Sequence, residues 1–203
     1  MSLTKQSKIL TKQQIQTMSS YLISKRNGLR NQTIFLLSVL SGLRSKEISH
    51  LSYREILTSD GEIGNSIHLT NHSSKGNKGG RVIPIHKQLK ENLIKLYSIL
   101  KKKSYFNPQT SFVIQSERQP FMTSQSVVNF FQRIYHNLGF IGCSSHSGRR
   151  TFITNTSKKI SLVGGSLRDI QYLSGHSSLQ TTQRYIEGDS ESRTKVVNLL
   201  DYK

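Results

Sequence analysis

The chain has 203 residues, of which 34% are hydrophobic and 20% are charged, a balance typical of a folded protein with one substantial core. Its 29 lysines and arginines oppose 11 aspartates and glutamates, a formal net charge of +18, which favours a polyanionic partner because neutralised phosphates release counterions. No apolar run approaches the roughly 20 residues of a membrane span, no hydrophobic signal segment opens the chain, and a single cysteine, Cys143, excludes an internal disulfide. We therefore expect a cytoplasmic protein with a nucleic-acid partner, and charge alone leaves DNA and RNA both open.

The first part of the chain is predicted to be helical. Residues 1–10 are polar and basic and are expected to be an N-terminal arm, ahead of a domain over residues 11–203. Thr11 has the character of an N-cap, and Gln14, three residues on, completes a capping box. Gly42 is expected to end a buried apolar helix. The predicted helices are Thr11–Ser24, Arg30–Leu43 and one that begins near Ser45.

Residues 53–85 have a different pattern, in which turns separate short runs rich in β-branched side chains. The turns are Ser59-Asp60-Gly61 and the glycine-rich stretch 76–80. Side chains such as Ile67 and Val82 favour strands, because branched residues suit a pleated surface. We expect a small antiparallel sheet of three strands, Arg54–Leu57, Ser66–Thr70 and Arg81–Ile85.

Helices return after residue 86, and Gly139 and Gly164-Gly165 separate the later ones. The sequence contains no internal repeat, long linker or low-complexity tract. The expected fold class is α+β and mainly α-helical, a helical domain with a small three-stranded antiparallel sheet. The predicted helices are Lys87–Lys103, Ser124–Leu138, Ser145–Lys159, Ser166–Ser174 and Glu191–Leu200, with a short turn at Thr181–Ile186.

The run His146-Ser147-Gly148-Arg149 places two functional side chains one helical turn apart. Residues three apart on a helix project from the same face. A guanidinium can donate paired hydrogen bonds to phosphate oxygens, and an imidazole can donate or accept a proton near neutral pH. Taken alone, the pattern is better explained by a chance His-x-x-Arg with a basic surface pair at Arg149 and Arg150.

A second motif, Leu173-Ser174-Gly175-His176, is followed nine residues later by Tyr185. Gly175 is expected to end a helix and to place His176 on the turn that follows. A short segment capped by Thr181 or Thr182 would then present Tyr185. Without further context, His176 could be a cap residue and Tyr185 a half-buried aromatic side chain.

Two further motifs lie upstream. Arg44 follows Gly42-Leu43 and precedes Glu47, which we expect to orient Arg44 rather than to react, because a carboxylate touching a phosphate would repel it. An ordinary helix-surface ion pair of these two residues would contribute little. Lys75 and Lys78 lie at the tip of the predicted hairpin, and each is by default a solvated charge.

In this order and with these spacings, the motifs resemble the catalytic set of the tyrosine recombinases, the phage integrase family. The matching strings are Gly-Leu-Arg-x-x-Glu, Lys-Gly-x-Lys, His-x-x-Arg and Leu-x-Gly-His with a downstream tyrosine. The resemblance implies the recombinase fold and a nucleophilic tyrosine that forms a 3′-phosphotyrosyl bond with DNA and frees a 5′-hydroxyl. It implies that the catalytic residues are Arg44, Lys75, His146, Arg149, His176 and Tyr185, with Glu47 in support and with Lys78, Arg81, Arg150 and Arg184 binding DNA.

The same resemblance assigns roles. His146 would assist the tyrosine proton, Lys75 would protonate the leaving oxygen, and His176 would hydrogen-bond the phosphate. A tyrosine with its reference pKa of about 10 needs such help. No metal or cofactor is expected, because the chain has no carboxylate pair or Cys/His cluster suited to a metal and no nucleotide-binding glycine loop. The phosphotyrosine linkage conserves the bond energy, so rejoining needs no ATP.

The resemblance runs from about Thr11 to the end of the chain. Family members usually carry a separate core-binding domain, for which this chain has no room, so we expect an excised catalytic domain, a truncated gene or a minimal member. The expected partner is double-stranded DNA, on which a homo-tetramer would assemble, with a monomer possible without DNA. The alternatives are a type IB topoisomerase-like nicking-closing enzyme and a non-catalytic DNA-binding remnant. The sequence gives neither the DNA site nor the choice among integration, excision and dimer resolution.

Overall fold

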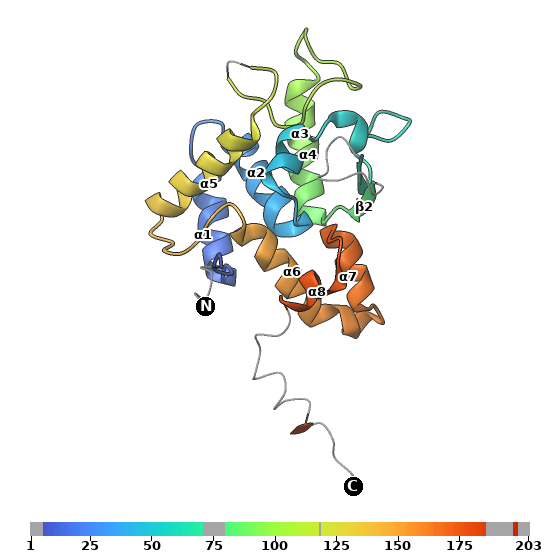
Figure 1. Cartoon of the computed structure of the whole chain (residues 1–203). Helices are drawn as coiled ribbons and strands as arrows, with labels where there is room; N and C mark the ends of the chain where they lie inside the picture. The colour runs from blue at the N-terminus through green and yellow to red at the C-terminus, as the bar shows by residue number, and fades with distance from the viewer. Residues whose placement is uncertain (1–5, 71–79, 118, 186–196, 199–203) are drawn as a thin grey trace. The chain divides into compact units, whose positions relative to one another are not determined.

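The computed structural model of the chain describes residues 6–70, 80–117, 119–185 and 197–198 (Figure 1). The chain divides into two compact units, Met1–Phe152 and Ile153–Lys203. Helices dominate, and the described residues include one small antiparallel sheet, so the predicted α+β, mainly helical fold class is confirmed. Within these ranges no helix combines the length and the apolar character needed to cross a membrane.

The elements of the first unit are, in order, α1 (Lys12–Ile23), α2 (Gly28–Ser41), α3 (Ser45–His50), the 3₁₀ helix η1 (Tyr53–Glu55), β1 (Ser66–Leu69), β2 (Arg81–Pro84), α4 (Lys87–Leu100), α5 (Ser124–Asn137) and the start of α6 (Ser147–Lys159). The second unit contains the rest of α6, the 3₁₀ helix η2 (Ile160–Val163), α7 (Leu167–Ser174) and α8 (Leu179–Gln183).

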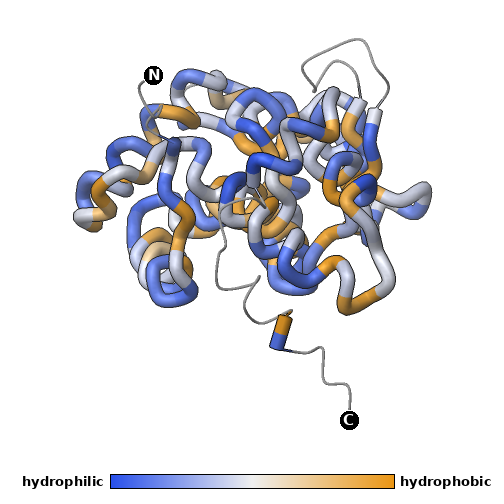
Figure 2. The backbone as a smooth tube through the Cα atoms, turned by 60° about the horizontal axis from the view of Figure 1, so that its bottom comes forward, coloured by the Kyte–Doolittle hydropathy of each residue, from blue (hydrophilic) through white to orange (hydrophobic). Residues whose placement is uncertain are grey.

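The first two helices begin and end as local side-chain chemistry predicts. The Thr11 hydroxyl accepts from the backbone N–H of Gln14 (3.1 Å), and the Gln14 side chain accepts from the N–H of Thr11 (3.0 Å), which completes the capping box. Gly42 ends α2 in the left-handed conformation, at φ +65°. α2 packs against both α1 and α4, and hydrophobic and hydrophilic segments alternate along the helices (Figure 2). The most buried part of α2 comprises Ile34, Phe35, Leu36 and Leu37, each at most 1% exposed.

The sheet has two strands, where three were predicted. β1 and β2 pair antiparallel, with Ile67 opposite Ile83 and Leu69 opposite Arg81. These four side chains are buried, whereas the intervening Val82 is exposed. The alternation of the strand therefore puts Arg81 on the same buried face as Ile83.

The prediction of a strand at Arg54–Leu57 is wrong. Residues 53–55 form η1 instead, because the Glu55 carboxylate accepts hydrogen bonds from both the backbone N–H (2.9 Å) and the hydroxyl (3.0 Å) of Ser52 and so closes a capped turn. Leu57 makes one isolated β-bridge with Ile63. A local carboxylate cap has overridden the strand propensity of the apolar residues here.

Part of the segment predicted to be an N-terminal arm is bonded to the first unit. Lys8 donates its backbone N–H to the carbonyl of Gly142 (3.0 Å), and Leu10 donates its N–H to the Thr151 hydroxyl in α6 (2.8 Å). The Leu10 side chain is only 3% exposed. Residues 8–10 therefore pack against the start of α6 rather than extending away from it.

The second unit is built from short capped helices. Gly175 ends α7 at φ +60°, as predicted, and α7 packs against α8. The predicted turn at Thr181–Ile186 begins earlier and as a helix, because the Ser178 hydroxyl caps α8. Of the helix predicted over Glu191–Leu200, only residues 197–198 lie within the described part of the chain, and both have helical backbone.

Candidate active site

Arg149 reaches from the first turn of α6 to the C-terminal end of α2. Gly148 permits a close approach of the two helices, because a Cβ at its position would overlap the Ser38 side chain. Arg149 is 5% exposed, and its Nη1 donates to the backbone carbonyl of Gly42 at 2.6 Å. Carbonyls at a helix C-terminus have no partner within the helix, so this bond satisfies a group that needs a donor. The hydrogen bond fixes the Arg149 guanidinium to Gly42, which lies two residues before Arg44 in the sequence.

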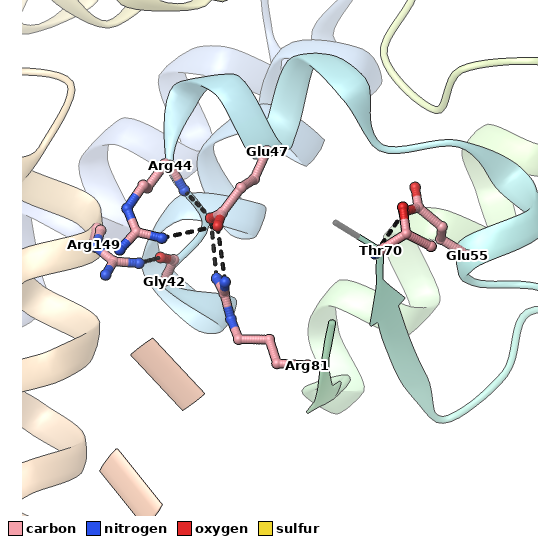
Figure 3. Close-up of polar contacts among 7 residues, drawn as sticks. All are labelled: Gly42, Arg44, Glu47, Glu55, Thr70, Arg81 and Arg149. Carbon is pink, nitrogen blue, oxygen red and sulfur yellow. Dashed lines mark hydrogen bonds and ion pairs between the residues drawn. The ribbon is translucent and has the colours of Figure 1, made fainter. Parts of the chain in front are cut away.

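Arg44, Glu47 and Arg81 form a cluster around one buried carboxylate (Figure 3). Glu47 Oε1 accepts from Arg44 Nη1 (2.9 Å) and from Arg81 Nη1 (2.8 Å). Glu47 Oε2 accepts from the backbone N–H of Arg44 (2.7 Å) and from Arg81 Nη2 (3.0 Å). The carboxylate thus caps α3 and holds two guanidinium groups at once, and Arg44 and Arg149 lie side by side next to it (Figure 3).

The electrostatics of the cluster favour a charged Glu47. Burial alone would raise the pKa of this carboxyl, whose side chain is 1% exposed. The hydrogen bonds and the positive charge of Arg81, followed by those of Arg44, outweigh burial and bring the pKa below its ordinary value of 4.5. Glu47 is therefore an anion at neutral pH, unlike the weak surface partner that a simple ion pair would be.

His146 lies immediately before α6 and beside the two arginines. Its side chain is exposed, and its backbone N–H donates to the Ser144 hydroxyl at 3.2 Å. Partial loss of solvent, and then the charges of Arg149 and Arg44, lower the pKa of this imidazole from its ordinary 6.5. The neutral form, which can accept a proton, is therefore favoured at neutral pH.

Buried carboxylates bind the described residues on both sides of the β1–β2 loop. Glu55 Oε1 accepts from the backbone N–H and from the hydroxyl of Thr70, each at 3.2 Å, just after β1 (Figure 3). Glu47 holds Arg81 at the start of β2. The predicted lysines, Lys75 and Lys78, fall in residues 71–79, outside the described residues, and Lys75 as the catalytic lysine stays a prediction.

The second unit brings together His176 and Tyr185. Their rings stack, with centroids 5.5 Å apart and planes inclined by 21°. The buried hydroxyl of Thr182 hydrogen-bonds His176 Nδ1 at 2.9 Å, and the Thr182 carbonyl accepts the backbone N–H of Tyr185 at 3.1 Å. Thr182 therefore contacts both predicted catalytic residues of this unit.

The predicted residues fall into two groups. Arg44, His146 and Arg149 come together in the first unit, and His176 with Tyr185 in the second. Of the predicted DNA-binding residues, Arg184 is exposed at the end of α8, whereas Arg150 is half-buried and donates from Nη1 to the carbonyl of Ser7 (3.0 Å).

Arg81, which was predicted to bind DNA, is buried in the structure rather than exposed at the surface. It is 7% exposed, with both terminal nitrogens on Glu47. The burial follows from strand alternation, since Arg81 and Ile83 are two residues apart, but the partner lies 34 residues away and has no local signal. The prediction that Thr181 or Thr182 caps the segment before Tyr185 is wrong: Ser178 caps α8, and Thr182 lies inside the helix and bonds His176. Across the described ranges, no group of three or more His, Cys, Asp and Glu side chains could hold a metal ion.

Residues 8–192 match the phage integrase family, and the chain belongs to that family. The solved structures it resembles include a Tn1549 transposon integrase in complex with a circular intermediate DNA, with 18% identity and a TM-score of 0.73 over 98% of this chain and 67% of that one. The XerA recombinase has 18% identity and a TM-score of 0.73 over 96% of this chain and 65% of that one. A lambda integrase dimer bound to a core site has 19% identity and a TM-score of 0.66 over 90% of this chain and 60% of that one.

These likenesses establish the fold. The chain spans about two thirds of the first-named structure and less of the other two. No curated protein sequence matches the chain at a significant level.

Proposed function

We propose that this chain is the catalytic domain of a site-specific DNA recombinase, which cleaves and rejoins DNA strands through a 3′-phosphotyrosine intermediate. The proposal extends to double-stranded DNA as the substrate, assembly of several copies on it, and action in the cytoplasm. Solved relatives with Tn1549 transposon ends, XerH sites and lambda core sites are complexes with DNA, and the charge of +18 suits the same partner.

One observation carries the proposal. Two guanidinium groups, of Arg44 and Arg149, come from residues far apart in the chain and lie side by side (Figure 3). Partial burial and the charges of these two arginines lower the pKa of the His146 imidazole. Paired guanidiniums suit the non-bridging oxygens of a phosphodiester, because they donate several hydrogen bonds in a plane and neutralise its charge. Phosphoryl transfer depends mostly on such positioning and charge stabilisation.

The proposed reaction uses groups of this chain alone. The Tyr185 oxygen attacks phosphorus and gives its proton to neutral His146, while the bond from phosphorus to the 5′ oxygen breaks and Lys75 protonates that oxygen. Arg44 and Arg149 stabilise the charge on the phosphoryl oxygens, with His176 donating a further hydrogen bond. Reversal of the same steps by a 5′-hydroxyl rejoins the strand, with each proton returned to its donor.

The test is covalent capture on DNA. The protein is incubated with a pool of duplexes that carry a nick next to randomised sequence. Cleavage then releases a short fragment, and because this fragment is lost the strand cannot be rejoined and the covalent adduct accumulates. We expect a protein–DNA species that survives denaturant, disappears with Tyr185→Phe and persists with Tyr172→Phe, the matched control on α7. Sequencing of the captured DNA identifies the preferred site. Absence of any adduct from the wild-type chain, or an adduct that Tyr185→Phe still forms, would overturn the proposal.

A further inference from the structure

We infer that Arg81 is a positioning residue, which acts through Glu47 to hold the Arg44 guanidinium in place for the phosphate. The inference rests on the proposed function and assigns Arg81 a role other than contact with DNA. Its side chain is buried at the start of β2, opposite Leu69, and its two terminal nitrogens meet the two oxygens of Glu47 at 2.8 and 3.0 Å.

The geometry transmits orientation. A two-pronged bond from a planar guanidinium fixes the plane of a carboxylate as well as its position. Once that plane is fixed, Oε1 holds Arg44 Nη1 at 2.9 Å and Oε2 holds the Arg44 backbone N–H at 2.7 Å. The side chain of Arg44 is 27% exposed, against 7% for Arg81, so Arg44 is the arginine of this pair that can meet a ligand.

The charges lead to the same assignment. A single carboxylate paired with Arg44 alone would cancel its charge. With Arg81 also on the carboxylate, Glu47 is shared between two guanidinium groups and does not by itself cancel the charge of Arg44. A buried carboxylate left with one partner is also costly, which explains why a strand position that alternation assigns to the core is occupied by arginine.

Arg81 also ties two elements together. It opens β2, directly after residues 71–80, and its bond to Glu47 joins that strand to the first turn of α3. On the other side of the loop, Glu55 bonds Thr70. β2, which follows the residues that contain Lys75 and Lys78, is therefore fixed to the same carboxylate that orients Arg44.

The variants are Arg81→Met, which removes the charge, and Arg81→Lys, which keeps the charge but cannot donate two parallel hydrogen bonds to the carboxylate. Arg26→Met is the matched control, since Arg26 forms a comparable 2.8 Å pair with Glu117 on an exposed surface. Thermal melts establish that each variant is folded. Rates of adduct formation at saturating DNA are then compared on two nicked duplexes, one with a normal scissile phosphate and one with an uncharged methylphosphonate at that position.

On the normal phosphate, Arg81→Met is expected to slow adduct formation on the order of 10- to 100-fold, as small misplacements of a catalytic group do, with a smaller loss for Arg81→Lys. DNA affinity should stay close to that of the wild type. On the methylphosphonate the loss should shrink to within about threefold, because this substrate lacks one of the two non-bridging oxygens and its negative charge, which Arg44 would otherwise neutralise. An unchanged rate in folded Arg81→Met, an equal loss on both substrates, or weaker DNA binding at an unchanged rate would overturn the inference, and the last result would make Arg81 a DNA contact.

A second measurement needs no DNA and separates this inference from the proposed function. The side-chain Nε–H resonance of Arg44, assigned with Arg44→Lys, is followed by NMR. It should shift and exchange faster with solvent in Arg81→Met, and stay as in the wild type in Arg26→Met. If the Arg44 resonance is the same in Arg81→Met as in the wild type, Arg81 is not a positioning residue, whether or not an adduct is found. Conversely, failure of the wild type to form a Tyr185-dependent adduct refutes the proposed function alone.

Discussion

Arg149 donates from Nη1 to the carbonyl oxygen of Gly42 at 2.6 Å, across 107 residues of sequence. The acceptor is the residue that ends α2, and a cation at the C-terminus of a helix is stabilised by the helix dipole as well as by the hydrogen bond. Arg44 follows two residues later. A single helix end therefore fixes the position of both arginines, one by a bond and one by the chain.

This arrangement makes Gly42 sensitive to substitution. Gly42→Ala should destabilise the protein by about 2–4 kcal/mol, because φ +65° disfavours a side chain and the new Cβ would overlap the Phe152 ring. Gly139→Ala is the control, since Gly139 has φ +67° with no heavy atom within 4 Å of the added Cβ, and it should lose only about 1–2 kcal/mol. Urea unfolding of both variants measures the difference, and equal losses would mean that the overlap with Phe152 is relieved without cost.

Glu47→Gln should destabilise the protein in a pH-dependent way. The pKa of Glu47 is lowered in the folded chain, so its stabilising contribution is present above the ordinary value of 4.5 and is lost as the pH falls through the folded pKa below it. At neutral pH the variant should lose about 3–5 kcal/mol, because the buried guanidinium of Arg81 and the half-buried one of Arg44 lose a charged partner. Urea midpoints of the two proteins should converge as the pH drops below about 4.5. A difference in urea midpoint that stays constant across this pH range would show that the charge of Glu47 does not stabilise the folded chain.

His146 should titrate below 6.5, and Arg44→Gln should raise its pKa, because one of the three causes of the shift is then gone. Arg54→Gln, an exposed arginine on η1, is the charge-matched control and should leave His146 unmoved. NMR titration of the imidazole measures both. In the wild type, adduct formation should fall on the acid side as His146 is protonated, with a midpoint below 6.5. If His146 titrates in the same way in all three proteins, the charge of Arg44 does not lower its pKa.

Local chemistry made the helix ends predictable from the sequence. Thr11 with Gln14, and the helix-ending glycines Gly42 and Gly175, are where the motifs place them, because caps depend on residues a few positions apart. The expected partner of Arg44 is also found, three residues away at Glu47.

The sequence pattern is incomplete where a side chain has a partner that the pattern does not include. Arg54–Leu57 has strand propensity, but a Ser52–Glu55 cap turns the chain first. The charge of Arg81 predicts a DNA contact, and in the structure both of its terminal nitrogens bond Glu47, which lies 34 residues earlier on a helix. Charge alone does not tell a basic side chain that faces solvent from one that faces a buried carboxylate.

Thr182 provides a test in the second unit. Thr182→Val keeps the shape but removes the hydroxyl that bonds His176 Nδ1, and should cost about 1–2 kcal/mol of stability. Thr182→Ser, which retains the hydroxyl, should lose less. The same order is expected for the rate of adduct formation, because the bond fixes the imidazole ring and the tautomer it presents. NMR of the His176 ring nitrogens reports the tautomer directly; an identical tautomer in Thr182→Val would assign the hydroxyl a purely structural part.

Binding of the isolated chain to duplex DNA should be weak and strongly dependent on salt. A charge of +18 attracts phosphates of any sequence, so we expect a Kd of about 10⁻⁴–10⁻⁶ M at physiological salt and a linear fall of log affinity with log salt. Fluorescence anisotropy at several salt concentrations measures both quantities. Tight binding to one sequence that resists salt would show that the chain reads bases without further help.

The buried carboxylate has a further consequence for the reaction. Among the described residues, the cluster contains three positive charges, on Arg44, Arg81 and Arg149, and one negative charge, on Glu47, so that its described side chains have an excess of two positive charges. An intact phosphodiester has one negative charge, and in the proposed reaction a second develops on phosphorus-bound oxygens as the tyrosine oxygen loses its proton and attacks. The cluster therefore matches the transition state better than the resting DNA, and only such differential stabilisation accelerates the chemical step. Without Glu47, a third positive charge would tighten the grip on uncleaved DNA as well.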